Sequence, residues 1–355
     1  MGRRGRQGLR FHHRRRTLQG RLRLHPHPHA RVSAMTAQPT SFPLERARVA
    51  APRLAVVIPT KNRRDSLPRT LASVLDNGRA DIELVVIDDG STDGTEHYLA
   101  TVDDPRLAWR RRPTSVGANR ARNEGAALSS APLIAFLDSD DAFRPGRLDR
   151  LIAFFDANPD IACSIDGFSD VSDSGERVHR LPRTTPDSAK LRQLLLCHCI
   201  PLTNSTVTVR RAAFTAVGGY DPDLWRHQDR ELLLRLARQH RIAFGAATDV
   251  LKYRSGNSIS RNHAGYIRGL DDFVARCPDY RSPDYESMLS YLTVRGALKA
   301  FAQGHFDVAL AEMKDWRKAG NLPGGLHVLP GYFVGRRQRR LLEKALDQPA
   351  TTSAE

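Results

Sequence analysis

The sequence predicts an α/β fold: a mixed, mostly parallel sheet flanked by helices, with a helical C-terminal extension. Between residues 53 and 166, short apolar segments alternate with amphipathic helical segments, as in parallel strands joined by crossover helices. Beyond residue 261 this alternation ends and helical periodicity dominates. The chain has 355 residues, which is long enough for a full hydrophobic core and for roughly two domains of about 150 residues each.

Each expected element follows from its local pattern. Apolar runs predict four strands, at 54–58, 83–88, 133–137 and 161–165. Apolar residues at helical spacing predict two crossover helices, one carrying Leu67, Leu71, Val74 and Leu75 and the other carrying Leu148, Leu151, Ile152 and Phe155. Pro145 is well placed for the start of the second helix. The later pattern predicts, in order, a hairpin or loop at 169–183, a helix at 187–197, a strand at 205–209, a helix near 226–239, and helices at 285–301 and 306–316.

The basic charge of the chain belongs mostly to its leader. The net charge is +16, but residues 1–34 hold ten arginines and no acidic residue, which leaves +6 for the remainder. The leader has neither the apolar stretch of a secretory signal nor a trustworthy helical periodicity, so we expect it to be disordered. An open alternative is that translation starts at Met35 and that the native product lacks residues 1–34.

The apolar stretches and the cysteines argue against a membrane-spanning protein and against a protein stabilised by disulfides or zinc. The longest apolar stretches fall well short of the roughly 18 residues needed to span a bilayer. The four cysteines do not form a disulfide framework or a zinc-finger spacing, so we expect buried free thiols in a reducing cytoplasm.

An acidic block closes the apolar run at 132–137. Asp138, Asp140 and Asp141 follow directly, where turn residues begin. Open α/β sheets bind ligands just beyond the carboxyl ends of such strands. Carboxylates this close repel one another unless solvent or a cation spreads the charge, and hard oxygen ligands suit Mg²⁺ or Mn²⁺ bridging to substrate phosphates. The alternative is a solvated acidic turn ahead of a helix.

Two other strand tips are expected at the same sheet edge. The first strand runs into residues 59–63, and the second ends in the acidic and hydroxyl-rich segment 88–94. These tips supply acceptors and donors that suit a nucleotide. The alternative for 88–94 is a helix cap, which we expect to account for one of these residues but not for all. In the following donor-rich helical segment, Arg122 is a candidate to steady an Asp or a phosphate oxygen, or else forms a surface ion pair.

A further carboxylate, Asp229, opens the helix expected near 226–239. It precedes Leu232 by three residues and Leu236 by seven, which places it on the buried face of that helix. The helix dipole favours an anion at this end. The alternative is a capping residue tied to Arg226 or His227.

Five blocks in this order resemble the family 2 glycosyltransferases of the GT-A fold, over about residues 53–258. They are VVIPTKNR at 56–63, VVIDDGSTDGT at 85–95, ARNEGA at 121–126, LDSDD at 137–141 and QDRELLLRLA at 228–237. The resemblance implies a GT-A domain at 51–260. The composition of the leader and the end of the alternation after this domain add a disordered leader at 1–50 and a helical accessory region at 261–355.

The resemblance also implies roles for individual residues. The residues expected to hold the donor are Pro59, Thr60, Lys61, Arg63, Asp88, Asp89, Arg122 and Asp138. The Asp-x-Asp block would hold ribose and a divalent Mg²⁺ or Mn²⁺ ion, with Asp140 and Asp141 as candidate metal ligands beside Asp138. Asp229 matches the catalytic base. Gln228 stands where the family commonly has glutamate, and this departure puts an acceptor contact in doubt. A turn at 255–258 is expected to close over the donor. The histidine that some members place there is missing, and His263 is a distant substitute.

The expected activity is inverting transfer of a sugar from a nucleotide-diphosphate donor, with a UDP-sugar as first choice, to a glycan or lipid-linked acceptor in polysaccharide or glycoconjugate synthesis. The expected location is the cytoplasm, with peripheral contact to the inner membrane face through the basic segment at 336–346 left open. Sugar-phosphate nucleotidyl transfer is disfavoured because no Gly-rich phosphate loop is present. Nucleic-acid or membrane-surface binding by a protein with a degenerate site remains the other alternative.

Overall fold

The computed structural model describes residues 49–253, 264–325 and 328–347. The predictions for the leader up to residue 48, for the turn at 255–258 and for His263 therefore lie outside the described residues.

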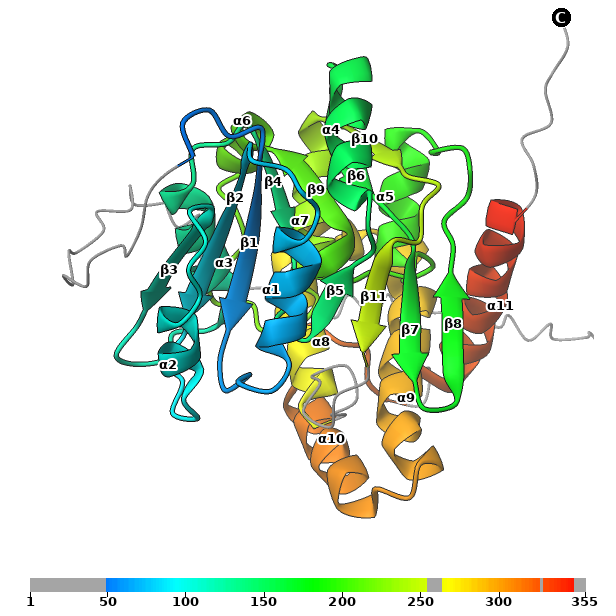
Figure 1. Cartoon of the computed structure of the whole chain (residues 1–355). Coiled ribbons are helices and arrows are strands. Elements are labelled where there is room, and N and C mark those ends of the chain that lie inside the picture. Colours follow the sequence, from blue (N-terminus) through cyan, green and yellow to red (C-terminus); the bar gives the residue numbers. More distant parts are fainter. Residues whose placement is uncertain (1–48, 254–263, 326–327, 348–355) are drawn as a thin grey trace, which may run out of the picture. The chain divides into compact units, whose positions relative to one another are not determined.

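The main sheet has seven strands in the order β10-β6-β9-β4-β1-β2-β3 (Figure 1). Their bounds are β1 Leu54–Thr60, β2 Ile82–Asp88, β3 Leu107–Arg111, β4 Leu133–Phe136, β6 Ile161–Ile165, β9 Val207–Arg210 and β10 Arg241–Phe244. Strand β9 is antiparallel to both of its neighbours, β4 and β6, while the other pairings are parallel. The predicted α/β class with a mixed, mostly parallel sheet is confirmed.

The strand order reverses between β1 and β4. The chain builds β1, β2 and β3 outward and then returns to β4 on the other side of β1. Strands β1 and β2 run in register from the Leu54–Ile82 pair to the Thr60–Asp88 pair, so both tips end together. In open α/β sheets a crevice for ligands forms at such a reversal, outside the carboxyl ends of the strands. The acidic block therefore follows β4 at the place where this topology favours binding.

Alternation along β1 divides the helices between the two faces of the main sheet. Val56 and Ile58 share a buried cluster with helices α1 (Leu67–Leu75) and α4 (Arg147–Ala157). Val57 points to the other cluster, which contains residues of α3 (Ala118–Leu128), α5 (Ser188–Leu196) and α7 (Gln228–Gln239). Both faces of the central strands are covered, as the continuous apolar composition of these strands requires.

A smaller sheet extends from the acidic block. It has the order β5-β11-β7-β8, with β5 at Asp141–Phe143, β7 at Phe168–Ser172, β8 at Gly175–His179 and β11 at Val250–Tyr253. Strands β7 and β8 form the hairpin predicted within 169–183. Because β5 begins at Asp141, this sheet connects the acidic block to the hairpin.

The C-terminal helices are α8 (Tyr266–Arg276), α9 (Glu286–Ala302), α10 (Phe306–Lys318) and α11 (Val328–Asp347). The predicted helices at 285–301 and 306–316 are confirmed within two residues at each end. Phe273 of α8 and Leu292 of α9 belong to the same buried cluster as Leu232 and Leu233 of α7. The helices after residue 264 thus share a core with the preceding α/β part, and a domain boundary near residue 260 stays a prediction.

The remaining described elements are short. They are α2 (Thr95–Ala100), α6 (Arg211–Ala216) and single 3₁₀ turns at Asn204–Thr206, Pro278–Arg281 and Pro283–Tyr285. All four cysteines are buried and unpaired, as predicted. Within the described residues, every helix is too short or too polar to cross a membrane.

Candidate active site

The acidic block places two carboxylates partly in solvent. The side chain of Asp138 is 23% exposed and that of Asp140 is 16% exposed. Each has a cationic neighbour: Arg122 Nη2 lies 2.6 Å from Asp138 Oδ1, and Arg63 Nη2 lies 3.3 Å from Asp140 Oδ2. The block is therefore not a plain solvated turn, because Arg63 after β1 and Arg122 of α3 balance its charge. It is not a closed cage either, because both carboxylates are partly exposed.

Helix α1 holds the backbone of the block. Thr70 Oγ1 donates to the carbonyl oxygens of Asp141 at 2.7 Å and Ser139 at 3.1 Å. The Arg69 guanidinium donates to the carbonyl oxygen of Asp140 at 3.0 Å. These bonds fix the direction in which the carboxylates leave the chain.

Asp141 lies behind its neighbours and is fully buried. Ser205 Oγ donates to Asp141 Oδ2 at 2.6 Å and accepts from the N–H of Asp138 at 3.0 Å. Oδ1 of Asp141 has no hydrogen-bond partner among the described atoms. Burial, together with the charges of Asp138 and Asp140, raises the pKa of Asp141 to about 7, against the opposing charge of Lys252.

Ser205 reaches this position because the chain turns there. A strand was predicted over 205–209, but it begins only at Val207, and Asn204–Thr206 form a 3₁₀ turn. This prediction was wrong at its first two residues. The turn brings the hydroxyl of Ser205 under the acidic block instead of leaving it in a strand ladder.

Lys252 is a site residue that the sequence did not reveal. In the small sheet it is directly opposite Asp141 of β5 and Asp170 of β7, so the three side chains share one face of the sheet. Its ammonium donates to Thr203 Oγ1 at 3.5 Å. Burial lowers the pKa of Lys252, but the carboxylates of Asp141, Asp138, Asp140 and Asp170 outweigh burial and leave it raised. A partly exposed cation of the small sheet thus faces the acidic block.

Asn62 joins the tips of β1 and β2. Its N–H donates to Ser91 Oγ at 2.8 Å, and its Oδ1 accepts from the N–H of Thr92 at 2.8 Å. The backbone of Asn62 is left-handed, with φ of 52°, a conformation that asparagine tolerates better than most residues. The two tips therefore form one connected rim beside the block.

Asp88 and Asp93 stabilise this rim from within. Asp88 Oδ1 accepts from the N–H and the hydroxyl of Ser91 at 2.9 and 2.5 Å, and burial raises the pKa of Asp88. Asp93 Oδ1 accepts from the N–H of Thr95 at 3.0 Å, in the first turn of α2. Asp93 thus bonds to the first residue of α2, whereas the bonds of Asp88 stay within the turn at 88–91, in line with the expectation that helix capping accounts for one residue of this segment but not for all.

Asp89 is bonded to a different loop. Its two carboxylate oxygens accept from the N–H groups of Val116 and Gly117, each at 2.9 Å. The residue is 4% exposed. Asp89 therefore fixes residues 116–117, which lead into α3, and leaves little carboxylate surface for a ligand. A direct contact with the donor stays a prediction for Asp88 and Asp89.

Arg122 connects α3 to the acidic block. It is 4% exposed and makes the expected bond to an aspartate, Asp138, rather than a surface ion pair. Its guanidinium also lies 5.4 Å from the centre of the Tyr220 ring. Burial lowers the pKa of Arg122, but Asp138, Tyr220 and Asp229 outweigh burial and leave it raised. The charge of Asp229 thus acts on the arginine that binds Asp138.

Two asparagines of α3 hold the segment that precedes α7. Asn123 exchanges two hydrogen bonds with the backbone of Tyr220, at 2.8 and 2.9 Å. Asn119 donates to the carbonyl oxygens of Asp221 at 2.7 Å and Leu224 at 2.6 Å. One face of α3 therefore contacts both the acidic block and the chain leading to Asp229.

Asp229 lies in the first turn of α7, half-buried. Of the described residues, only the N–H of Arg230 hydrogen-bonds to its carboxylate, at 2.8 Å. The N-cap residue of the helix is His227, which is left-handed with φ of 60° and accepts no capping bond. A non-glycine residue in this conformation stores strain, which proteins tend to keep at functional sites.

The residues fit a metal ion that is shared with a substrate. Within the described residues, no group of three or more His, Cys, Asp or Glu side chains could hold a metal. However, Mg²⁺ is commonly held by one or two carboxylates and completed by substrate phosphates and water. The partly exposed Asp138 and Asp140 fit that arrangement, whereas the carboxylate of Asp141 is fully buried behind them.

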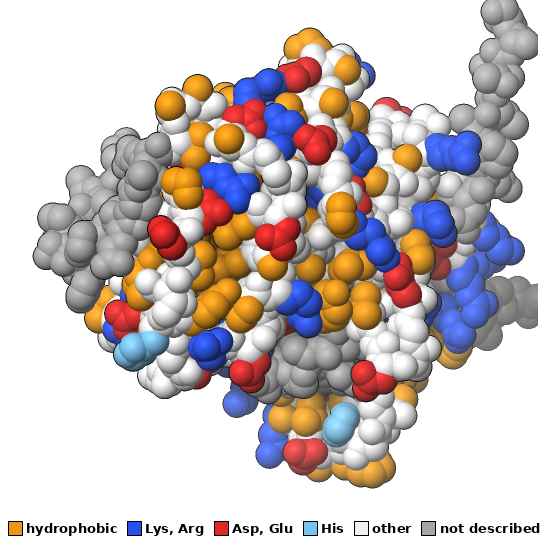
Figure 2. Space-filling view, viewed as in Figure 1, with side chains coloured by type: hydrophobic (Ala, Val, Ile, Leu, Met, Phe, Trp, Pro, Cys, Tyr) orange, Lys and Arg blue, Asp and Glu red, His pale blue; other side chains and the backbone are white. Residues whose placement is uncertain are grey.

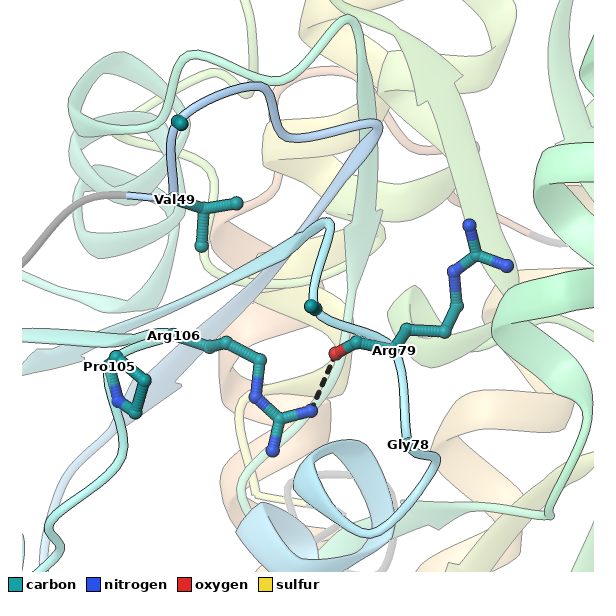
Figure 3. A pocket seen from close by; sticks show the side chains of 7 residues that line it. Val49, Gly78, Arg79, Pro105 and Arg106 are labelled. Carbon is teal, nitrogen blue, oxygen red and sulfur yellow. Dashed lines mark hydrogen bonds between the residues drawn. The ribbon is translucent and has the colours of Figure 1, made fainter.

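A surface hollow elsewhere on the sheet is not part of this site. Figure 3 shows its lining, which comes from the segments preceding β1, β2 and β3 and comprises Val49, Ala50, Gly78, Arg79, Ala80, Pro105 and Arg106. Arg106 Nη1 donates to the carbonyl oxygen of Arg79 at 2.7 Å across it. These segments lie at the amino ends of parallel strands, so the hollow is at the sheet edge opposite the acidic block.

The sheet, the rim and the acidic block together define a GT-A type transferase fold. The crystal structure of S. aureus TarS residues 1–349 in complex with UDP-GlcNAc has the same fold, with a TM-score of 0.61 and 17% identity. The match covers 83% of this chain and 90% of that one. At this identity the likeness establishes the fold.

Residues 55–218 match the family model described as glycosyl transferase family 2. Four of the five sequence blocks lie within the match. The resemblance stated from the sequence is confirmed.

Relatives with assigned names extend the comparison. TuaG of Bacillus subtilis, named for teichuronic acid biosynthesis, is 29% identical over 218 residues, or 59% of this chain and 82% of that protein. The succinoglycan biosynthesis protein ExoU of Rhizobium meliloti is 42% identical over 102 residues, or 28% of this chain and 30% of that protein. The chain thus spans most of the first relative and under a third of the second.

Proposed function

We propose that the chain transfers a sugar, with inversion, from a nucleotide-diphosphate donor to an acceptor hydroxyl during polysaccharide or glycoconjugate synthesis. Helix α3 carries this proposal, because its Arg122 pairs with Asp138 of the acidic block while its Asn119 and Asn123 bind the chain that leads to Asp229. A donor site and a base for the acceptor would thus be side by side. The polysaccharide context follows the names of TuaG and ExoU.

The tip of β1 would contact the nucleotide. Thr60 is 3% exposed, and its hydroxyl has no hydrogen-bond partner among the described atoms, as expected of a group that a ligand completes. Pro59, Lys61 and Arg63 border it at the same edge. A UDP-sugar is the first donor to test, since the structurally similar TarS was crystallised with UDP-GlcNAc.

Asp138 and Asp140 would hold Mg²⁺ or Mn²⁺ together with the diphosphate. The ion would supply positive charge that stabilises the leaving diphosphate. Arg63 and Arg122 would keep the two carboxylates in place, since each lies beside one of them. Asp141 would add its charge from behind, with Ser205 orienting it.

Asp229 would accept the proton of the acceptor hydroxyl. Its carboxylate receives a single hydrogen bond from the described residues, so lone pairs remain for an acceptor. The first turn of α7 supplies backbone N–H groups whose dipoles favour the anion.

Calorimetry of UDP, GDP and TDP, each with and without Mn²⁺, tests the donor site. We expect one nucleotide to bind in a metal-dependent manner, and Asp140→Ala to abolish that binding. Asp173→Ala, in the exposed turn between β7 and β8, is the matched control and should bind like the unmodified chain. Failure of all three nucleotides to bind, or full binding by Asp140→Ala, would refute the proposed site.

A separate experiment tests the base. Asp229→Asn should keep nucleotide binding but lower the transfer rate by about 10²- to 10⁴-fold, the usual contribution of general-base catalysis. Transfer would be followed with the donor identified by calorimetry and a mixture of membrane-derived acceptors. An unchanged rate would exclude Asp229 as the base.

A further inference from the structure

Helix α11 has one face fixed against the protein and one facing solvent. Gly331 and Gly335 let it approach α9 closely: an added Cβ would lie 2.6 Å from Ser290 Oγ at the first and 2.1 Å from the carbonyl oxygen of Ser287 at the second. Leu342 continues this inner side as a buried residue. Because the inner side is set by this packing, the residues on the opposite side face away from the protein.

The outer face of α11 exposes large apolar side chains in its first half. Leu329 is 57% exposed, Phe333 is 64% exposed and Val334 is 57% exposed. Leu341 continues the face with 58% exposure. Single exposed apolar residues are ordinary, but several on one face of one helix indicate an interaction surface.

From Arg336 onward the outer face is mainly basic. Arg336, Arg337, Arg340 and Lys344 are all exposed. Glu343 is paired with Arg339, whose Nε donates to it at 2.8 Å, so this acid does not neutralise the four outer cations. Figure 2 shows Lys and Arg side chains gathered over α11, at the right of the view. The face thus combines apolar side chains with four positive charges.

The combination of apolar and basic side chains on the outer face of α11 favours one kind of binding partner. A nucleic acid would leave Leu329, Phe333 and Val334 in water, and a second copy using the same face would oppose cations to cations. A helix with apolar and basic residues on one side suits the boundary of an anionic bilayer, where apolar groups insert and cations meet headgroups. We propose that the outer face of α11 binds an anionic lipid surface.

Helix α10 provides the internal comparison. It also exposes apolar side chains, with Phe306 at 63% and Leu310 at 56%. The exposed neighbour of Phe306, however, is an acid, Asp307. The exposed cations of α10 come only in its last two turns, at Lys314, Arg317 and Lys318.

The charge beside each exposed phenylalanine therefore differs between the two helices. An anionic headgroup would be repelled by Asp307 at Phe306, whereas it would be attracted at Phe333 by Arg336 and Arg337, one turn further along α11. The lipid surface is accordingly assigned to α11. Phe306 of α10 is as exposed as Phe333, but its charged neighbour is an acid instead of a base. The assignment rests on α11 alone and not on the proposed transfer reaction.

A fluorescent reporter on α11 tests the proposal with the full chain. Phe333→Trp should shift its emission to the blue when vesicles of phosphatidylcholine mixed with phosphatidylglycerol are added, and brominated lipid should quench it. Phe306→Trp on α10 is the matched control and should not respond, and the unmodified chain supplies the background of the native tryptophans. A reporter within α11 separates its insertion from any binding by the arginine-rich leader.

Charge variants test the basic half. In the Phe333→Trp background, Arg337→Gln and Arg340→Gln should each weaken the response by about fivefold, the effect of roughly 1 kcal/mol per cation near an anionic surface. High salt should weaken it as well. No response to anionic vesicles, an equal response to neutral ones, or an equal response from Phe306→Trp would overturn the proposal. Unchanged thermal unfolding of each variant would show that α11 is still folded.

Discussion

Single residues decide how the acidic block carries its charge. Arg122 and Arg63 balance Asp138 and Asp140, while Lys252 faces the buried Asp141 from the small sheet. Without these cations, adjacent carboxylates in a partly buried place would repel one another and take up protons. Lys252 also opposes the binding of a metal ion, because its positive charge already neutralises part of the carboxylate charge that would attract one.

Replacement of Lys252 by Met tests this opposition. We expect Lys252→Met to bind Mn²⁺ more tightly than the unmodified chain in the absence of nucleotide, by about tenfold, since a nearby unit charge in a partly screened site contributes energies of this order. Calorimetric titration with Mn²⁺ measures the change. Lys318→Met, on the exposed surface of α10, should leave the affinity unaltered. Weaker Mn²⁺ binding by Lys252→Met would show that Lys252 organises the site instead.

His227 links the stability of the protein to pH. Burial, with smaller contributions from the charges of Arg230 and Arg226, lowers the pKa of His227 to about 3 from an unfolded value near 6.5. Below pH 6.5 the unfolded chain binds a proton that the folded chain refuses, so the free energy of unfolding is fully retained above this pH and falls as pH drops toward 3. The loss is about 1.4 kcal/mol per pH unit from this residue.

His227→Asn should remove the share of the pH dependence that belongs to this residue, while His198, whose pKa burial also lowers, keeps its own share. The left-handed backbone is kept, because asparagine tolerates it. We expect the unfolding free energy of the variant to fall less steeply between pH 6 and pH 4 than that of the unmodified chain, as measured by urea denaturation. His240→Asn, at the other end of α7, is the comparison. Parallel pH profiles for the His227 variant and the unmodified chain would contradict the assignment.

Some short strands could not be predicted from the sequence pattern. The strands β1, β2, β4 and β6 were predicted from apolar runs, and each is buried along its whole length. Strands β3 (Leu107–Arg111) and β11 (Val250–Tyr253) were missed, because both are short and carry basic side chains. Their place in a sheet depends on partners distant in sequence, which local propensity does not contain.

The same limit applies to the site. The acidic block, Arg122 and Asp229 were found because they stand in recognisable blocks. Ser205 and Lys252 were not, because each is an ordinary residue within its own segment and gains its role only when the turn at Asn204–Thr206 and the small sheet bring it to Asp141. No signal within the single sequence marks them.

Helix α3 depends on a glycine for its distance from the sheet. A Cβ at Gly125 would lie 2.5 Å from Val57 Cγ1 of β1, closer than side chains approach. Gly125→Ala should therefore destabilise the protein by about 1–3 kcal/mol, the usual cost of overpacking a core, although alanine favours a helix by roughly 1 kcal/mol. Chemical denaturation measures the change.

Gly320→Ala is the control for that substitution, because an added Cβ there has open space and the backbone is not left-handed. It should leave stability unchanged or raise it slightly. If Gly125→Ala proved as stable as Gly320→Ala, α3 would have room to move and the packing argument would fail. A shift of α3 would also move Arg122, so nucleotide binding by Gly125→Ala should weaken along with its stability.

The molecule as a whole is held together by a core that continues into the C-terminal helices. Phe273 of α8 is fully buried, and its ring lies 5.2 Å from that of His227 and 5.8 Å from that of Tyr280, centre to centre. His227 immediately precedes α7, which carries Asp229. The helices after residue 264 therefore support the start of the helix on which the proposed base stands.

Phe273→Ala tests whether the two parts of the chain behave as one unit. The loss of a buried aromatic ring should lower the unfolding free energy by about 3–5 kcal/mol. Since the cavity opens in the shared core, we expect one cooperative transition shifted to lower denaturant, seen alike by far-UV circular dichroism and by tryptophan fluorescence. Phe306→Ala, on the exposed face of α10, should have little effect. Two separate transitions, with the C-terminal helices melting first and nucleotide binding intact, would instead establish a distinct accessory domain after residue 260.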